Sequence, residues 1–99
     1  MVDIAVNEKE WNKLSDHDKA RINEIMKTSG LILEGDSIVG AKKPGVLTPA
    51  WHIPNPVCKL GCNVAEAAAI AACATFSGAA AAVCIAAAHT AADYCRSRC

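Results

Sequence analysis

The sequence predicts an all-α fold whose C-terminal part is an antiparallel helical hairpin stapled by nested disulfides. Two observations carry this prediction. Apolar residues make up 53% of the 99 residues but aromatic residues only 4%. Much of the apolar fraction is alanine, and sixteen alanines lie in residues 58–99. Alanine is the best helix former. The same stretch holds all six cysteines, in a palindromic spacing: Cys58, Cys62, Cys73, Cys84, Cys95 and Cys99.

The spacing of the cysteines pairs the two arms of the hairpin. Eleven residues make three helical turns plus roughly 20°, so cysteines eleven residues apart lie on one face of a helix. The mirror point of the palindrome falls between Gly78 and Ala79, next to the poor helix formers of Thr75–Gly78. Folding the chain there makes each cysteine face its mirror partner. We therefore predict the disulfides Cys58–Cys99, Cys62–Cys95 and Cys73–Cys84.

Alanine is also the residue that such a hairpin needs along its seam. A disulfide requires Cα atoms about 4.4–6.8 Å apart, and helices held that closely leave no room for Leu or Phe between them. Alanine buries little apolar area, so the core is expected to be thin. Crosslinks worth roughly 2–4 kcal/mol each compensate for it.

The first 40 residues form a charged segment with helix-start signals. Asn7–Glu10 is a capping-box pattern that predicts a short helix, and Ser15–Asp18 begins a second one. Gly30 is a suitable residue to end that helix. Residues 31–39 predict two very short strands around a Glu-Gly-Asp turn, a tiny β-hairpin. The apolar face is so small that we expect the segment to fold weakly or on docking.

A proline-punctuated linker follows at residues 41–57, so the chain divides into residues 1–40, 41–57 and 58–99. All four prolines fall in thirteen of its residues, and each favours extended backbone before it. Such connectors are open to proteases. The candidate cleavage points are the Gly40–Ala41 step and Lys42–Lys43.

The composition excludes several functions. Ten basic residues balance ten acidic ones, which gives no electrostatic reason to expect nucleic-acid binding. The sequence has no Cys-x-x-Cys motif, so a thioredoxin-type redox site is unsupported. His17 and His89 lack a nucleophile–acid constellation and are expected to be solvated helix residues. We therefore expect neither an enzyme nor a cofactor.

Two other interpretations of the cysteine-rich module remain open. A zinc site could be formed by four of its cysteines, Cys58, Cys62, Cys95 and Cys99, but it leaves Cys73 and Cys84 unexplained. A transmembrane hairpin is disfavoured because each arm has fewer than the roughly 20 residues that a span needs. The arms are also interrupted by polar residues at three positions, Glu66, His89 and Asp93. Contact with a membrane surface or transient insertion stays possible.

The three-part organisation resembles the precursor of a bacteriocin-type ribosomal peptide, with a charged leader and a cysteine-rich core. Gly40–Ala41 resembles the end of leader peptides exported by peptidase-containing transporters. The nested crosslinks are similar to those of glycocins and plant α-hairpinins, although glycocins use shorter intervals. Glycocins carry a sugar in the loop, where the matching positions here are Thr75 and Ser77.

The resemblance implies a secreted antimicrobial precursor. Its leader is read by an exporter or processing enzyme, and no Sec-type signal peptide is visible at the N-terminus. The core acts on the membrane or an envelope receptor of competitor cells. The core's net charge of +1 slightly favours a receptor over cationic lysis. The alternative is a non-catalytic interaction or scaffold module with a rigid hairpin, and the zinc site gives a third class, a metal-binding protein.

Overall fold

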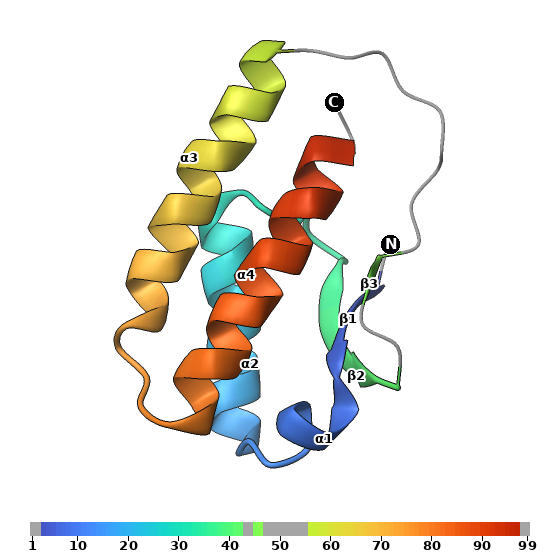
Figure 1. Ribbon diagram of the computed structural model, residues 1–99, viewed down its shortest axis with the longest axis vertical. Helices are drawn as coiled ribbons and strands as arrows, with labels where there is room; N and C mark the ends of the chain where they lie inside the picture. Colours follow the sequence, from blue (N-terminus) through green and yellow to red (C-terminus); the bar gives the residue numbers. More distant parts are fainter. Residues whose placement is uncertain (1–2, 43–44, 47–55, 98–99) are drawn as a thin grey trace.

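The computed structural model describes residues 3–42, 45–46 and 56–97. Their elements in order are β1 (Asp3–Asn7), α1 (Glu8–Trp11), α2 (Asp16–Ser29), β2 (Ser37–Ala41), β3 (Gly45–Val46), α3 (Pro56–Cys73) and α4 (Ala79–Ser97). The helices α3 and α4 form the predicted antiparallel hairpin, and α2 lies behind them (Figure 1). A small sheet lies beside α4, on the side away from α3 (Figure 1).

The expectation of an all-α fold is wrong, because the described residues include a three-stranded sheet of order β2-β1-β3. The strands β1 and β2 are parallel, with Ile4 opposite Ile38, and β1 and β3 are antiparallel. Parallel strands need a crossover connection, which α1 and α2 supply. Ile4 and Ile38 are both buried, so the alternation of β1 and β2 turns their apolar side chains into the core.

The predicted β-hairpin over residues 31–39 is also wrong. The Glu-Gly-Asp turn is present, since the Asp36 amide donates to the Leu33 carbonyl at 3.0 Å and Gly35 has φ 93°. The residues on either side do not pair with each other, because β2 pairs with β1 instead. Leu31 and Ile32 are buried, and their amides donate to the Met26 carbonyl at the end of α2.

The predicted N-terminal helices are confirmed, with their caps. The Asn7 side chain accepts a hydrogen bond from the Lys9 amide, and the Ser15 hydroxyl accepts one from the Asp18 amide at 3.1 Å. Gly30 ends α2 in the left-handed conformation at φ 90°, which glycine adopts without a Cβ clash. The ends of these helices are therefore set by capping residues that lie within a few positions of them in the sequence.

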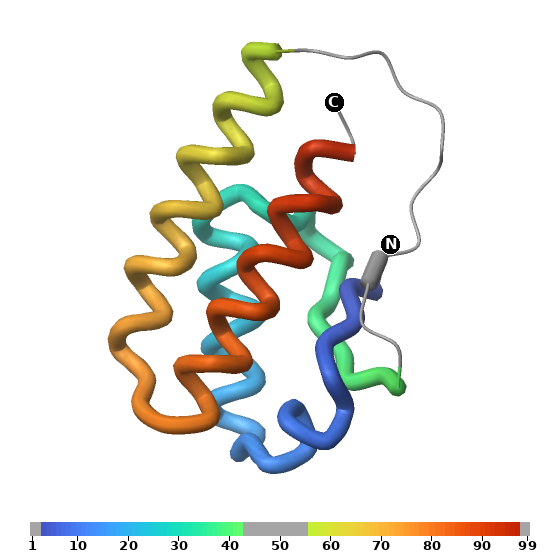
Figure 2. Tube along the Cα trace, viewed as in Figure 1, coloured from blue at the N-terminus to red at the C-terminus, as the bar shows by residue number. Residues whose placement is uncertain are grey.

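A single core joins the N-terminal segment to the hairpin. The buried cluster contains Ile22 and Met26 of α2, Ile4 of β1, and Val83 and Ala87 of α4. Helix α2 packs against both α3 and α4, and β1 packs against α4. The path of the chain shows residues 3–42 laid along the hairpin (Figure 2). The N-terminal segment is thus folded on the hairpin, which supplies the apolar surface that its own residues lack.

Candidate functional site

The disulfide-stapled hairpin is the candidate functional site, and two of its three expected crosslinks are confirmed. Cys62 and Cys95 are joined with their Cα atoms 5.8 Å apart, and Cys73 and Cys84 with theirs 5.5 Å apart. Both distances fall in the range of about 4.4–6.8 Å that disulfides require. The expected Cys58–Cys99 bond lies outside the described residues, because they end at residue 97. No cysteine among the described residues is free.

The seam between the helices is built from alanine, as the spacing of the backbones requires. Ala69 of α3 is fully buried, as are Ala88 and Ala91 of α4, which lie within roughly 40° of Cys84 around the helix at 100° per residue. Their small side chains let the backbones approach to disulfide distance. Helix α4 is buried on two sides, against α3 and against β1 and α2, whereas α3 packs against α4 and α2. Consequently α3 keeps a large exposed surface.

A polar cluster crosses the open end of the hairpin, and we call it the Glu66 cluster. Arg96 donates to Glu66 Oε1 at 3.2 Å, to Asn63 Oδ1 at 2.9 Å and to Asp93 Oδ1 at 2.6 Å. His89 Nδ1 lies 2.9 Å from Glu66 Oε2. The hydrogen bond to Asp93 is the largest influence on the Arg96 guanidinium and raises its pKa above the ordinary value; partial burial opposes this rise, and the hydrogen bond to Glu66 adds to it. Arg96 therefore stays cationic and bridges the two helices.

The Glu66 cluster was not among the predicted sites, although the sequence carries a signal for it. The cysteine partners have residue numbers that add to 157, and Asn63–Arg96 and Glu66–His89 come within about two of that sum. The mirror that pairs the cysteines also pairs these polar residues. His89 is exposed as expected, with 60% of its side chain accessible, but Glu66 contacts it.

The loop residues considered for modification differ in their surroundings. The Thr75 hydroxyl accepts a hydrogen bond from Arg21 at 3.0 Å and donates to the Ala72 carbonyl at 2.9 Å. The Arg21 guanidinium also lies 4.7 Å from the centre of the Phe76 ring, within reach of a cation–π interaction. Ser77 is exposed. A sugar on the Thr75 oxygen would remove the hydrogen that this hydroxyl donates to the Ala72 carbonyl and would crowd Arg21, whereas Ser77 is accessible.

The candidate cleavage points lie at the end of the sheet. Gly40 and Ala41 belong to β2 and pair with Val6 and Asn7 of β1. Lys42 is exposed just after the strand, and Lys43 lies outside the described residues. A protease binds its substrate as an extended strand, so cleavage at Gly40–Ala41 requires β2 to leave β1 first. Lys42 is the more accessible point.

The zinc interpretation has no support in the described residues. Cys62 and Cys95 are joined to each other, so they cannot both be thiolate ligands. No group of three or more His, Cys, Asp or Glu side chains among the described residues is placed to hold a metal ion.

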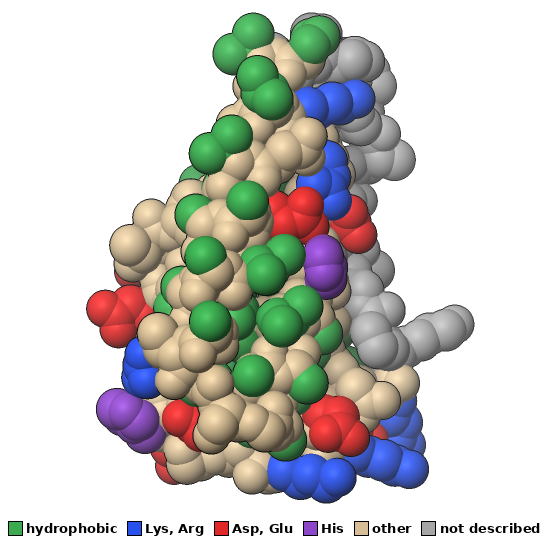
Figure 3. All heavy atoms as spheres, turned by 60° about the vertical axis from the view of Figure 1, so that its left-hand side comes forward, with side chains coloured by type: hydrophobic (Ala, Val, Ile, Leu, Met, Phe, Trp, Pro, Cys, Tyr) green, Lys and Arg blue, Asp and Glu red, His purple; other side chains and the backbone are tan. Residues whose placement is uncertain are grey.

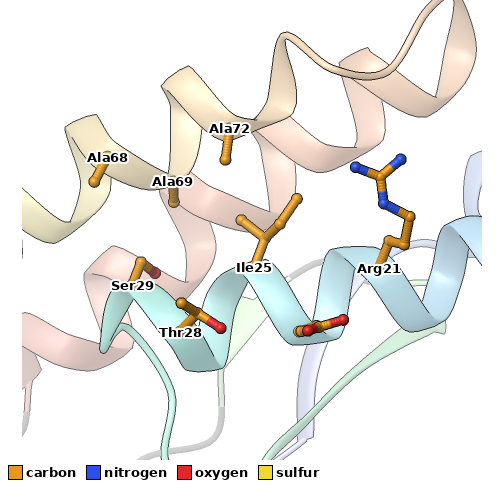
Figure 4. Close-up of a pocket in the computed structure, with 8 residues that line it drawn as sticks. Arg21, Ile25, Thr28, Ser29, Ala68, Ala69 and Ala72 are labelled. Carbon is orange, nitrogen blue, oxygen red and sulfur yellow. The ribbon is translucent and has the colours of Figure 1, made fainter.

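A groove of about 450 Å³ runs between α2 and α3. Ile25 points from α2 toward the alanines of α3, and Arg21 lies at one end of the groove (Figure 4). Half of its lining residues are aliphatic, Ile25 of α2 and three alanines of α3, and the other half are Arg21, Glu24, Thr28 and Ser29 of α2. The groove is the contact zone between the N-terminal segment and the hairpin.

By length and composition, α3 could cross a membrane, and it is the only described helix that meets this test. Only 17% of it is buried.

No protein-family model, curated protein or solved structure matches the chain.

Proposed function

We propose that the chain is the precursor of a secreted, bacteriocin-like antimicrobial peptide. Residues 1–40 are the leader, the linker of residues 41–57 is where it is removed, and the hairpin of residues 58–99 is the product. The hairpin acts on the membrane or an envelope receptor of competitor cells. In this proposal the chain has no catalytic activity and no cofactor.

The covalently closed hairpin is the observation that carries this proposal. The Cys73–Cys84 bond closes the loop end, and Cys62–Cys95 joins the helices near the open end. These bonds and the Glu66 cluster lie within α3 and α4, so removal of the leader leaves all of them intact. Stable disulfides belong to oxidising environments such as the cell exterior, which supports secretion.

The leader, residues 1–40, has a second role beside recognition by an exporter or processing enzyme, because it covers part of the hairpin. In the intact chain α2 and β1 cover one side of α4, including Val83 and Ala87. Removal of residues 1–40 exposes that side. The leader therefore keeps part of the hairpin's apolar surface covered until processing.

The shared core favours one competing function, an interaction or scaffold module in which the chain stays whole. A buried cluster that includes Met26 of α2 and Ala87 of α4 gives the intact chain more stability than either part alone. In that case the N-terminal segment is a permanent half of the domain.

The intact mass of native material, measured without reduction, separates these functions. The precursor proposal expects a secreted product that has lost the first 40 to 57 residues and is about six hydrogens lighter than the form with six thiols. A full-length, disulfide-bonded chain that stays with the producing cells supports the scaffold module. A full-length chain with six free thiols contradicts both.

A further inference from the structure

The outer face of α3 is an uninterrupted apolar surface in the intact chain. Leu60 and Val64 are each 64% exposed and Val57 is 79% exposed. The exposed alanines Ala67 and Ala71 continue the same side of the helix, whereas Ala68 lines the groove with α2. We call Val57, Leu60, Val64, Ala67 and Ala71 the α3 outer face. In Figure 3 hydrophobic side chains follow this helix, and charged side chains lie to both sides of it.

The charges of α3 lie away from this face. Its two charged residues are Lys59 and Glu66. At 100° per residue, Glu66 lies roughly 160° around the helix from Val64, and Lys59 roughly 140°. Glu66 is turned toward α4, where it accepts from Arg96. The outer face therefore carries no charge over the length of the helix, about 27 Å for eighteen residues at 1.5 Å each.

Two ordinary reasons for a long apolar helix do not apply to α3. The core helix of a soluble protein is mostly buried, but only 17% of α3 is buried. A signal sequence lies near the N-terminus, but α3 begins at Pro56. What remains is a helix whose composition matches a lipid environment and whose outer face is exposed in the folded chain.

The chemistry of the face fits lipid better than a second copy of the chain. Stable protein interfaces depend on anchors such as Trp, Tyr and Arg in well-packed pockets, and the outer face has none of these residues. A row of Val, Leu and Ala offers little relief for a rigid partner to interlock with. Fluid acyl chains need no shape complementarity and gain from burial of any aliphatic surface.

We propose that the α3 outer face binds the lipid bilayer, with α3 lying parallel to the membrane plane. A helix of about 27 Å is shorter than the roughly 30 Å hydrocarbon core, and spanning would bury Glu66 together with its partners on α4. Lying flat, α3 places its outer face among the acyl chains and keeps the Glu66 cluster at the polar side. This inference rests on the proposed function, because it names the surface with which the hairpin acts on an envelope.

Vesicle sedimentation of the intact, oxidised chain tests this inference. The probes are vesicles of phosphatidylcholine alone and of phosphatidylcholine with phosphatidylglycerol, each at 0.1 M and 0.5 M NaCl. Because the face is uncharged, we expect binding to both compositions, changed less than about threefold by salt. Leu60→Lys and Val64→Lys should each weaken the partition coefficient about tenfold or more.

Leu33→Lys is the matched control. Leu33 is 52% exposed but lies in the loop between α2 and β2, outside the α3 outer face. Its substitution should leave the partition coefficient unchanged. All three positions are exposed, so the variants keep the fold, which far-UV circular dichroism and the mass of the non-reduced chain verify.

Three outcomes overturn the inference. The first is a wild-type chain that binds neither kind of vesicle, and the second is an equal loss of binding in the Leu33 control. The third is a dimer that Leu60→Lys converts to monomer, without vesicle binding, because the occupant of the face is then a second copy. None of these results depends on leader removal, so failure here and failure of the precursor proposal are distinguishable.

Discussion

Gly40 is fixed by its neighbours rather than by its backbone angles. A Cβ atom added there would lie 2.9 Å from Trp11 Cδ1 and 3.1 Å from the Cα atom of Glu8. Trp11 is 7% exposed, so its ring cannot move away easily. The glycine that resembles the end of a leader peptide is thus also the residue that lets α1 pack on β2.

Gly40→Ala is expected to lower the free energy of unfolding by about 1–3 kcal/mol, because the added methyl overpacks the Trp11 contact. Gly61→Ala is the control, since Gly61 lies in α3 with nothing within 4 Å of its Cβ position. It should raise stability by roughly 0.5–1 kcal/mol through helix propensity. Guanidinium unfolding followed by circular dichroism measures both. Equal effects at the two glycines would show that the Trp11 contact is unimportant.

Within the Glu66 cluster, Glu66 contributes more to the stability of the protein than Asp93 does. Its side chain is 19% exposed and contacts Arg96 and His89, whereas the Asp93 side chain is 73% exposed. We expect Glu66→Ala to cost about 1–2 kcal/mol, because Arg96 loses its less exposed carboxylate partner. Asp93→Ala should cost less than about 0.5 kcal/mol, as for an exposed ion pair. Urea unfolding at low and high salt checks the order, and a larger cost for Asp93→Ala would contradict it.

At the scale of elements, the hairpin could be predicted because its information is local and repeated. Alanine propensity, the break at Gly78 and the mirrored cysteines all indicate the same fold. The caps at Asn7, Ser15 and Gly30 were predictable for the same reason, since each depends on residues within one helical turn.

The sheet could not be predicted because its partners are distant in the sequence. Asp3–Asn7 is only five residues long, and its pairing strand begins at Ser37. The alternation of Ile4 and Val6 becomes meaningful only when α1 and α2 return the chain beside it. The exposure of the α3 outer face could not be predicted for a related reason. Alanine, Leu and Val on a helix do not reveal which side a third element covers.

The two confirmed disulfides should each contribute comparably to stability. Cys62–Cys95 spans 33 residues and Cys73–Cys84 spans 11, but the inner bond shortens the loop that the outer one closes, which brings the two loop lengths closer together. Replacing either pair by alanine is therefore expected to cost about 2–4 kcal/mol. Paired replacement leaves no odd thiol, and thermal unfolding of the two double variants gives the measurement. An unchanged midpoint in either variant would show that its crosslink constrains nothing.

At the scale of the whole molecule, cleavage and release of the N-terminal segment are separate events. Lys42 is exposed at the end of β2, so trypsin should cut after it. The pieces should still elute together in native size-exclusion chromatography, because Met26 and Ile22 of one piece pack in the core of the other. Denaturant should separate them, and mass spectrometry identifies the cut. A hairpin piece that elutes alone under native conditions would show that the shared core does not hold the halves together.

The central position of β1 also sets the order in which the chain can fold. Residues 3–7 lie between β2 and β3 and pack against α4, so this strand cannot complete its contacts until α4 has been synthesised. The α3–α4 hairpin needs only its own residues and can close as soon as Ser97 is available. Contacts between distant residues slow folding. The N-terminal segment is therefore the late-folding half, and the hairpin is the template on which it assembles.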